Sequence, residues 1–171
     1  MSITVRPAVE ADYDDVARLT RAAYLHGGHL TEADAYLERL ADVAHRAEHA
    51  TVWVAELDGK VAGAVTLTLA GGEYADIARP GELEFRMLAV DPALQRSGVG
   101  RALVQAIIEH ARQLPGVEAV SLTTGSDWER AHRLYWSLGF VRVPERDWNV
   151  PGTDIRLWVF RLDLKGPARR R

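Results

Sequence analysis

The chain has 171 residues, of which 47% are hydrophobic and 26% are charged, and its formal net charge is −3. This size and composition predict one soluble globular domain, and the slightly acidic charge argues against nucleic acid or an anionic membrane as a partner. The chain contains no cysteine, which excludes a disulfide framework, a thiolate metal site and a cysteine nucleophile, and we expect a cytoplasmic location.

The first fifty residues predict one strand followed by two helices. Residues 2–6 alternate as a strand that Pro7 ends, and they lack the apolar stretch of a signal peptide. An amphipathic helix is expected over residues 10–23, and a second one runs from a capping box at residue 31 to about residue 49. The residues between the two helices, 24–29, predict a loop.

A hairpin and a long loop come next. The β-rich runs 51–57 and 60–69 are separated by Asp58-Gly59, which is typical of a two-residue turn with positive φ at both positions. Residues 71–81 contain two adjacent glycines and a proline and predict a loop. The apolar run within 60–70 is far shorter than the ~20 residues of a membrane-spanning helix, so no membrane segment is expected.

The most informative stretch is a strand, a loop and a helix within residues 83–111. Residues 83–90 predict a strand, Asp91-Pro92 a turn, and residues 99–111 a helix with a one-sided apolar stripe. The loop between them, residues 95–100, offers successive backbone amides at a helix start, and its two glycines leave room for a ligand. Such a loop suits an anion, because the start of a helix is electropositive.

The remaining chain predicts a strand over 117–123, a helix ending at Leu138, and two strands over 140–144 and 155–162. The strands 83–90 and 117–123 bracket a helix and should therefore lie parallel. Ser126 and Glu129 resemble a capping box for the last helix, and Gly139 fits the left-handed position after it. We expect a mixed α/β fold with a mostly antiparallel central sheet and flanking helices, one domain over residues 1–164, and a flexible basic tail over 165–171.

Two other glycine-loop motifs fit this sequence less well. A phosphate-binding loop of the GxxxxGK[ST] type needs Lys and Ser or Thr after its second glycine, but Arg101 and Ala102 follow Gly100. A dinucleotide-binding fingerprint needs a third glycine where Leu103 stands, although Glu118 does occupy the place of a ribose-binding acid. A nucleotide-binding protein therefore remains a weaker alternative.

The segment Gln95 to Gly100 matches the Q/R-x-x-G-x-G/A signature of the GNAT superfamily of N-acetyltransferases. Ala131 to Phe140 resembles the family's A-x-x-L-Y-x-x-L-G-F ending, and residues 3–8 are similar to its first strand. The resemblance implies the GNAT (acyl-CoA N-acyltransferase) fold and an enzyme that moves an acetyl group from acetyl-CoA directly to a small-molecule or peptide amine, without a covalent enzyme intermediate. A non-catalytic acyl-CoA-binding sensor or regulatory domain is the alternative. Members of the family often pair, which leaves a homodimer open.

The resemblance also assigns the donor site and two catalytic roles. Tyr135 stands at the family's tyrosine position, where it usually acts as general acid. Glu84 is the predicted base, with a solvated or Arg86-paired glutamate as the alternative, and Glu82 is its substitute. The residues expected to hold the cofactor's pantetheine arm and pyrophosphate are Leu88, Ala89, Val90, Gln95, Arg96, Ser97, Gly98, Val99, Gly100 and Arg101.

The acceptor side is less defined by the sequence. In the family, two loops border the acceptor pocket, and the residues expected to line it here are Tyr24, His26, His29, Trp148 and Asn149. Many members carry an asparagine three residues before the alanine of the tyrosine helix, whereas this chain has Trp128 there. An acidic group, Glu73, Asp76, Glu82 and Glu84, would attract a cationic amine or form a solvated loop.

Two histidines raise the question of a metal site. His45 and His49 are four residues apart on a predicted helix, as zinc ligands often are. No third ligand is evident in the sequence, so we expect a solvated helix face and no metal.

Overall fold

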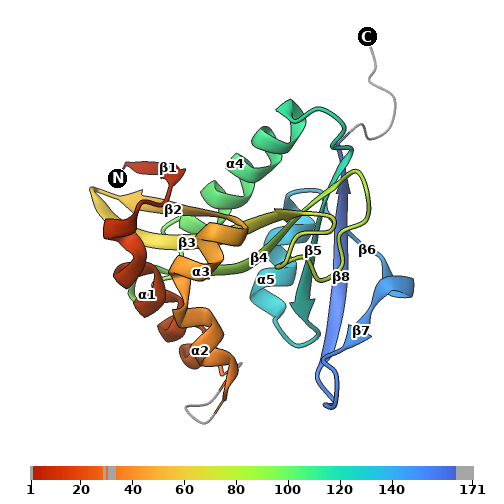
Figure 1. Cartoon of the computed structure of the whole chain (residues 1–171), viewed down its shortest axis with the longest axis horizontal. Coiled ribbons are helices and arrows are strands. Elements are labelled where there is room, and N and C mark those ends of the chain that lie inside the picture. Colours follow the sequence, from red (N-terminus) through yellow and green to blue (C-terminus); the bar gives the residue numbers. More distant parts are fainter. Residues whose placement is uncertain (1, 29, 31–33, 165–171) are drawn as a thin grey trace. The chain divides into compact units, whose positions relative to one another are not determined.

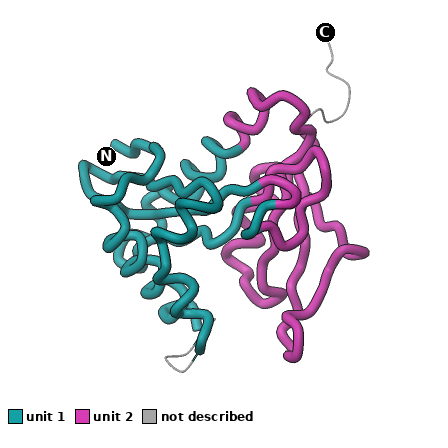
Figure 2. Tube along the Cα trace, in the orientation of Figure 1, with its two compact units in different colours: residues 1–68, 72–74, 85–107 teal, residues 69–71, 75–84, 108–171 magenta. Residues whose placement is uncertain are grey.

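The computed structural model describes residues 2–28, 30 and 34–164 (Figure 1). The chain divides into two compact units: residues 1–68, 72–74 and 85–107 form unit 1, and residues 69–71, 75–84 and 108–171 form unit 2 (Figure 2). The strand order in the sheet is β1-β2-β3-β4-β5-β8-β6, and β7 pairs with β8. His29, the residue that opens the predicted capping box (Thr31), and the tail 165–171 lie outside the described residues.

Unit 1 contains an antiparallel set of strands. The strand β1 (Ile3–Pro7) pairs with β2 (Thr51–Leu57), which pairs in turn with β3 (Lys60–Leu69). The strand β4 (Glu82–Val90) begins in unit 2 and continues in unit 1. The predicted hairpin turn is confirmed, because φ is 51° at Asp58 and 86° at Gly59.

The helices of unit 1 differ from the prediction at two places. A 3-10 turn η1 (Glu10–Asp12) leads into α1 (Tyr13–His26), so residues 24–26 are helical and the predicted loop there is wrong. The single helix predicted up to residue 49 is also wrong, because the structure has two, α2 (Tyr36–Ala41) and α3 (Val43–His49).

The break between α2 and α3 has a local cause. Asp42 leaves helical geometry with a ψ of 68°, and its side chain accepts a hydrogen bond of 3.3 Å from the His45 amide, which caps α3. Arg46, only 1% exposed, donates from Nη1 to the carbonyls of Arg39 and Leu40 at 3.2 and 3.0 Å. A buried guanidinium thus binds carbonyls at the end of α2.

Helices cover both faces of the unit 1 strands. On one face, Val16 and Leu19 of α1 and Val43 of α3 pack against residues of β2, β3 and β4, namely Val54, Ala64 and Ala89 (Figure 1). On the other face, the start of α4 (Val99–Gln113) approaches Gly63, the neighbour of Ala64 in β3. Adjacent strand residues point to opposite faces, so Gly63 and Ala64 place the two helical layers on opposite sides.

Unit 2 is built on β5 (Ala119–Gly125) and β8 (Arg156–Asp163), which pair antiparallel. The helix α5 (Glu129–Ser137) ends before Gly139, whose φ of 96° confirms the predicted left-handed position. The predicted capping box is wrong, because the N-cap residue is Trp128, whose indole donates hydrogen bonds but accepts none. The shorter elements are β6 (Val141–Arg142), η3 (Pro144–Arg146) and β7 (Trp148–Asn149).

The residue before β4 is hydrogen-bonded to the start of β5 within unit 2. The amides of Glu118 and Ala119 donate to the carbonyl of Gly81 at 2.7 and 3.2 Å, so the two strands start side by side, as parallel neighbours do. The predicted mixed α/β fold with a mostly antiparallel sheet is confirmed. Within the described residues, no helix combines the length and the apolar character needed to cross a membrane.

Candidate active site

The loop ahead of α4 is a compact turn in unit 1. It starts with a 3-10 turn, η2 (Pro92–Leu94), in which the side chain of Asp91 accepts a hydrogen bond from the Ala93 amide at 3.0 Å. The backbone is left-handed at Arg96, with a φ of 70°, and at Gly98, with a φ of 91°. A β-carbon at Gly98 would meet only Ile3 Cδ1, at 3.8 Å, so glycine is favoured there by the φ angle and not by crowding.

The amides at the start of α4 are the ones that the sequence predicts as an anion site. The hydrogen bond from the Ala102 amide to the Gly98 carbonyl, 2.9 Å long, belongs to the first turn of α4. The amides of Val99 and Gly100 precede that bond, in the first turn of the helix, where amides generally lack a partner within the helix and the helix dipole is positive. The Ser97 amide donates to the Leu94 carbonyl at 3.3 Å, so the amides after Ser97 are the ones best suited to a phosphate.

The loop lies directly against the strands of unit 1. A β-carbon added to Gly63 would lie 2.7 Å from Val99 Cγ1 and 3.1 Å from the carbonyl oxygen of Ala89. Only a residue without a side chain lets α4 begin this close to β3 and β4. The predicted pyrophosphate loop and the predicted pantetheine strand, residues 88–90, are therefore neighbours in unit 1.

The strand β4 runs unbroken from Glu82 to Val90 but has an unusual backbone conformation just before the predicted pantetheine site. Met87 has a φ of 55°, and a left-handed residue inside a strand is typical of a β-bulge, which disturbs the ladder of hydrogen bonds and redirects side chains. The expectation that Glu84, Arg86 and Leu88 share one face stays a prediction across Met87. Ala89 is buried, while Leu88 and Val90 are half-buried.

Glu84 is fully buried in unit 2, where backbone amides hold its carboxylate. Oε1 accepts hydrogen bonds from the amides of Asp76, Ile77 and Ala78 at 3.0, 3.1 and 3.0 Å. Amide donors of this kind stabilise the ionised form of a carboxylate and so weaken it as a base. The geometry shows Glu84 fixing the path of residues 76–78, and its predicted role as a general base stays a prediction.

Tyr135 projects from α5 into the core of unit 2. Its side chain is 5% exposed, and its ring contacts those of Phe140 and Phe160, with centroids 5.9 and 5.8 Å apart. Burial raises the pKa of the Tyr135 phenol well above its ordinary value, so the hydroxyl stays protonated at neutral pH. A protonated phenol is a hydrogen-bond donor, as the predicted role requires.

The predicted acceptor residues that the structure describes, all but His29, fall into two pairs. Tyr24 lies in α1, where its ring contacts that of Tyr36 at 6.3 Å, and exposed His26 is the last residue of the same helix. Trp148 and Asn149 form β7, paired with β8 in unit 2. The Trp148 indole donates to Thr123 Oγ1 at 3.4 Å, and Asn149 Oδ1 accepts from Arg156 Nη1 at 3.1 Å.

Trp128 occupies the position of the family's asparagine. Its indole covers Gly125 at the end of β5, because a β-carbon on Gly125 would lie 2.7 Å from Trp128 Cδ1. The glycine thus accommodates the indole.

The sequence analysis missed a buried ionic cluster around Glu82 in unit 2. Arg146 donates to both carboxylate oxygens at 2.8 and 2.9 Å, and Arg161 Nε donates to Oε2 at 3.0 Å. Burial alone would raise the pKa of Glu82, but the hydrogen bonds from Arg146, the Arg79 amide and Arg161 outweigh it and lower the pKa to about 2. Glu82 is therefore a weak base, and its contacts fit a structural role.

Comparison with known proteins gives a consistent result. The acetyltransferase (GNAT) family matches residues 13–140. The chain is 39% identical over 108 residues to the N-alpha-acetyltransferase RimI of Mycobacterium tuberculosis, covering 59% of this chain and 63% of that protein. It is 37% identical over 101 residues to the N-acetylaspartate synthetase of Danio rerio, and this match covers 58% of this chain and 33% of that protein. It is 32% identical over 147 residues to a mycothiol acetyltransferase of Cellulomonas flavigena, and this match covers 82% of this chain and 41% of that protein. The chain thus spans less than two thirds of each of these relatives.

Solved structures share the fold over nearly the whole chain. The structure of yncA from Salmonella typhimurium with its cofactor acetyl-CoA is 26% identical, with a TM-score of 0.71, and the match covers 99% of this chain and 98% of that one. The ribosomal-protein-S18-alanine N-acetyltransferase of Escherichia coli is 19% identical, with a TM-score of 0.68, and covers 95% of this chain and 94% of its own.

Proposed function

The chain belongs to the GNAT acetyltransferase family, and from that premise we propose that it transfers an acetyl group from acetyl-coenzyme A to an amine. The loop ahead of α4 is the observation that carries the proposal, because left-handed Arg96 and Gly98 lead directly into the electropositive start of a helix. The similarity to yncA, whose structure holds acetyl-CoA, supports the same donor.

The donor would be held by main-chain groups of unit 1. Residues 95–101 would bind the diphosphate, with the exposed guanidinium groups of Arg96 and Arg101 adding positive charge. The pantetheine arm contains amides, so it would add to residues 88–90 as an extra strand does. The left-handed Met87 supports this arrangement, because a β-bulge at such a residue would leave backbone groups for a ligand.

The reaction forms a bond between the acceptor nitrogen and the thioester carbonyl carbon and breaks the carbon–sulfur bond. The amine loses a proton, and the sulfur gains one. We assign Tyr135 the role of donor to the departing sulfur. An ordinary thiol has a pKa of about 8.5, below that of this buried phenol, so Tyr135 would stabilise the sulfur mainly as a hydrogen-bond donor.

The proton of the acceptor amine needs a separate route. The sequence predicts Glu84 as the base, but three backbone amides already bind its carboxylate. We therefore propose that Glu84 acts mainly as a positioning residue for residues 76–78. A Glu84→Gln variant tests the two roles: loss of a base steepens the pH dependence of kcat, whereas loss of positioning lowers kcat equally at every pH.

The acceptor is proposed as a small-molecule or peptide amine. The names of the relatives point to acceptors of different kinds, so none of them is carried over to this chain. Tyr24, His26, Trp148 and Asn149 are the proposed contacts. A cytoplasmic location and pairing into a homodimer complete the proposal and are tested by fractionation and by sedimentation.

A panel of amines with acetyl-CoA tests the function directly. Release of the coenzyme A thiol is followed with a thiol-reactive dye, and the chain contributes no background because it contains no cysteine. We expect turnover with at least one amine and a fall in kcat of ~100-fold or more in Tyr135→Phe. Tyr13→Phe is the matched control, since Tyr13 has no assigned role.

Two outcomes would count against the proposal. Failure of acetyl-CoA to bind would refute it outright. Saturable binding without turnover on any amine would favour the alternative, a non-catalytic acyl-CoA sensor. An unchanged rate in Tyr135→Phe would remove that residue from the mechanism while leaving the reaction in place.

A further inference from the structure

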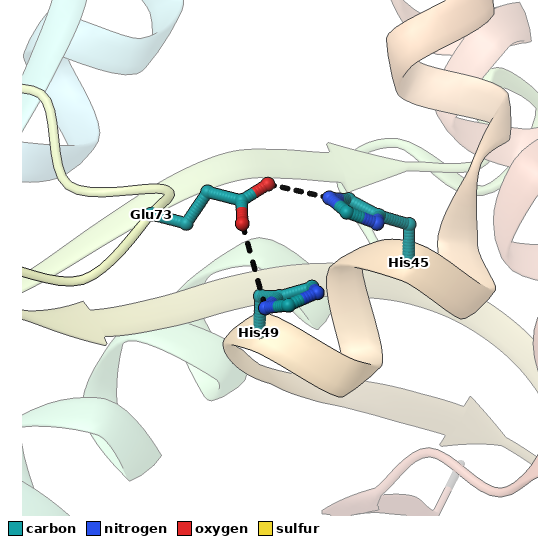
Figure 3. Close-up of side chains that lie close together, drawn as sticks. All are labelled: His45, His49 and Glu73. Atoms are coloured by element: carbon teal, nitrogen blue, oxygen red, sulfur yellow. Dashed lines mark hydrogen bonds and ion pairs between the residues drawn. The ribbon is translucent and has the colours of Figure 1, made fainter.

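Two histidines of α3 and one glutamate come together on the surface of unit 1. His45 and His49 project from the same face of the helix, and Glu73, from the segment 72–74, points one carboxylate oxygen toward each ring (Figure 3). We call these three residues the His–Glu cluster. We propose that the His–Glu cluster binds a divalent transition-metal ion, for which Zn²⁺ is the best-suited candidate.

The donor atoms already lie near the separations that an ion requires. One ligand atom from each residue lies within 4.8 Å of the other two. Zinc binds imidazole nitrogen at about 2.0–2.1 Å, so two ligands of a tetrahedral ion lie about 3.4 Å apart. His49 Nδ1 and Glu73 Oε1 are 3.4 Å apart, and His45 Nε2 and Glu73 Oε2 are 2.5 Å apart. A bound ion would take the place of the direct contact between His45 and Glu73, and these two atoms would have to move apart by about 0.9 Å.

The surroundings of the cluster favour binding through these atoms. The two rings lie on successive turns of one helix, with centroids 4.4 Å apart. With Nδ1 of His49 bound to the ion, its Nε2 would carry the proton, and Nε2 lies 3.5 Å from a carboxylate oxygen of Glu48. Histidine ligands of metals commonly donate their second N–H to a carboxylate in this way.

The chemistry of the donor set selects the type of ion. Two imidazoles and a carboxylate suit zinc and its first-row neighbours, whereas Mg²⁺ and Ca²⁺ prefer all-oxygen sites. The side chains of His45, His49 and Glu73 are 42%, 37% and 45% exposed, so an ion can enter and keep water in its remaining positions. Arg39 adds positive charge near Glu73, and we therefore expect weaker binding than in closed four-ligand sites.

A bound ion would fix the segment that follows it. Glu73 precedes Tyr74, whose carbonyl accepts a hydrogen bond of 2.9 Å from Arg86 Nη1 on β4, and Arg86 Nη2 donates to the Tyr36 hydroxyl at 3.0 Å. The ion would thus join α3 to the segment before β4 within unit 1. The proposed role of the ion is therefore structural and independent of the proposed acetyl transfer.

Titration of the tag-free, chelator-treated full chain with Zn²⁺ tests the proposal, with calorimetry and thermal unfolding as readouts. We expect one ion per chain and a rise in Tm of ~5 °C or more when zinc is at 100 times its Kd. His49→Ala and Glu73→Gln should each weaken binding by at least ~10-fold. The controls His110→Ala and Glu38→Gln remove a histidine and a carboxylate outside the cluster and should leave binding unchanged.

Several results would overturn the proposal. These are the absence of saturable 1:1 binding, binding that survives both His49→Ala and Glu73→Gln, or an equal stabilisation by Mg²⁺. In each case the cluster is only an ion pair between imidazole and carboxylate. Replacement by Co²⁺ gives an additional check, since its visible absorption spectrum reports imidazole ligands and should disappear in His45→Ala.

Discussion

The buried carboxylate of Glu82 offers the sharpest test of the energetics. Replacing Glu82 with Gln keeps the shape of the side chain but removes the charge that Arg146 and Arg161 contact, at 2.8 and 3.0 Å. The Glu82 side chain is only 5% exposed and that of Arg146 is 6% exposed, so water cannot replace the lost partner. Removing one member of a buried ion pair is destabilising, because it leaves the other charge uncompensated.

The size of the effect follows from the pKa of Glu82. The pKa falls from the ordinary 4.5 to about 2 in the folded chain. Each pKa unit corresponds to about 1.4 kcal/mol, so the ionised form contributes about 3 kcal/mol to the free energy of unfolding. Because the folded pKa is the lower one, this contribution is complete above pH 4.5 and is lost as the pH falls towards 2.

Urea unfolding followed by tryptophan fluorescence measures this difference. At pH 7, Glu82→Gln should unfold with a free energy about 3 kcal/mol below that of the parent chain. The difference should shrink as the pH is lowered from 4.5 to about 2. Glu145→Gln is the matched control: it removes the same charge from an exposed residue beside Arg146 and should change the free energy of unfolding by less than about 1 kcal/mol.

Two results would refute this reasoning about Glu82. One is a Glu82→Gln variant as stable as the Glu145→Gln control at pH 7. The other is a stability difference that stays constant between pH 7 and pH 3, which would show that the ionised carboxylate is not the source of the stabilisation.

Three further substitutions test separate contacts in unit 1. Gly63→Ala places a β-carbon 2.7 Å from Val99 Cγ1, so thermal unfolding should show a loss of about 1–3 kcal/mol. Gly98→Ala puts a side chain on a residue with a φ of 91°, and initial-rate kinetics should show a higher KM for acetyl-CoA with a smaller change in kcat. Asp12→Asn removes one of the two carboxylates that Arg6 contacts, 2.7 Å away, and should cost about 1.5–3 kcal/mol at pH 7. The hydrogen bond from Arg6 lowers the pKa of Asp12, so this cost should decrease as the pH falls below the ordinary carboxyl value, as urea unfolding at pH 7 and pH 3 would show.

Features set by local chemistry could be predicted from the sequence. The Asp58-Gly59 turn and the left-handed Gly139 depend on the conformational preference of one or two residues, and both are confirmed. The helix α4 was predicted from its start at Val99, because its apolar stripe is one-sided and most of it is buried.

Features set by packing and by buried side chains could not be predicted in this way. The helix α1 continues past residue 23 because Tyr24 and Leu25 pack against a core cluster built on Leu37, Leu40, Tyr74 and Met87. The break at Asp42 depends partly on Arg46, an arginine that a sequence pattern assigns to the surface and that the structure buries against the carbonyls of α2. Packing and burial override local propensity at both places.

The acidic residues between positions 73 and 84 show why the site was harder to predict than the fold. Their closeness in the sequence indicates one negatively charged surface for a cationic amine, but each has a different partner. Glu73 contacts His45, Glu84 contacts the amides of residues 76–78, and Glu82 contacts Arg146 and Arg161, which follow it by 64 and 79 residues. No local pattern encodes such distant partners. Because Glu82 and Glu84 are buried and engaged, we expect recognition of the proposed acceptor amine to depend on other groups, and the exposed residues of α1 and β7 are where substitutions should first change acceptor preference.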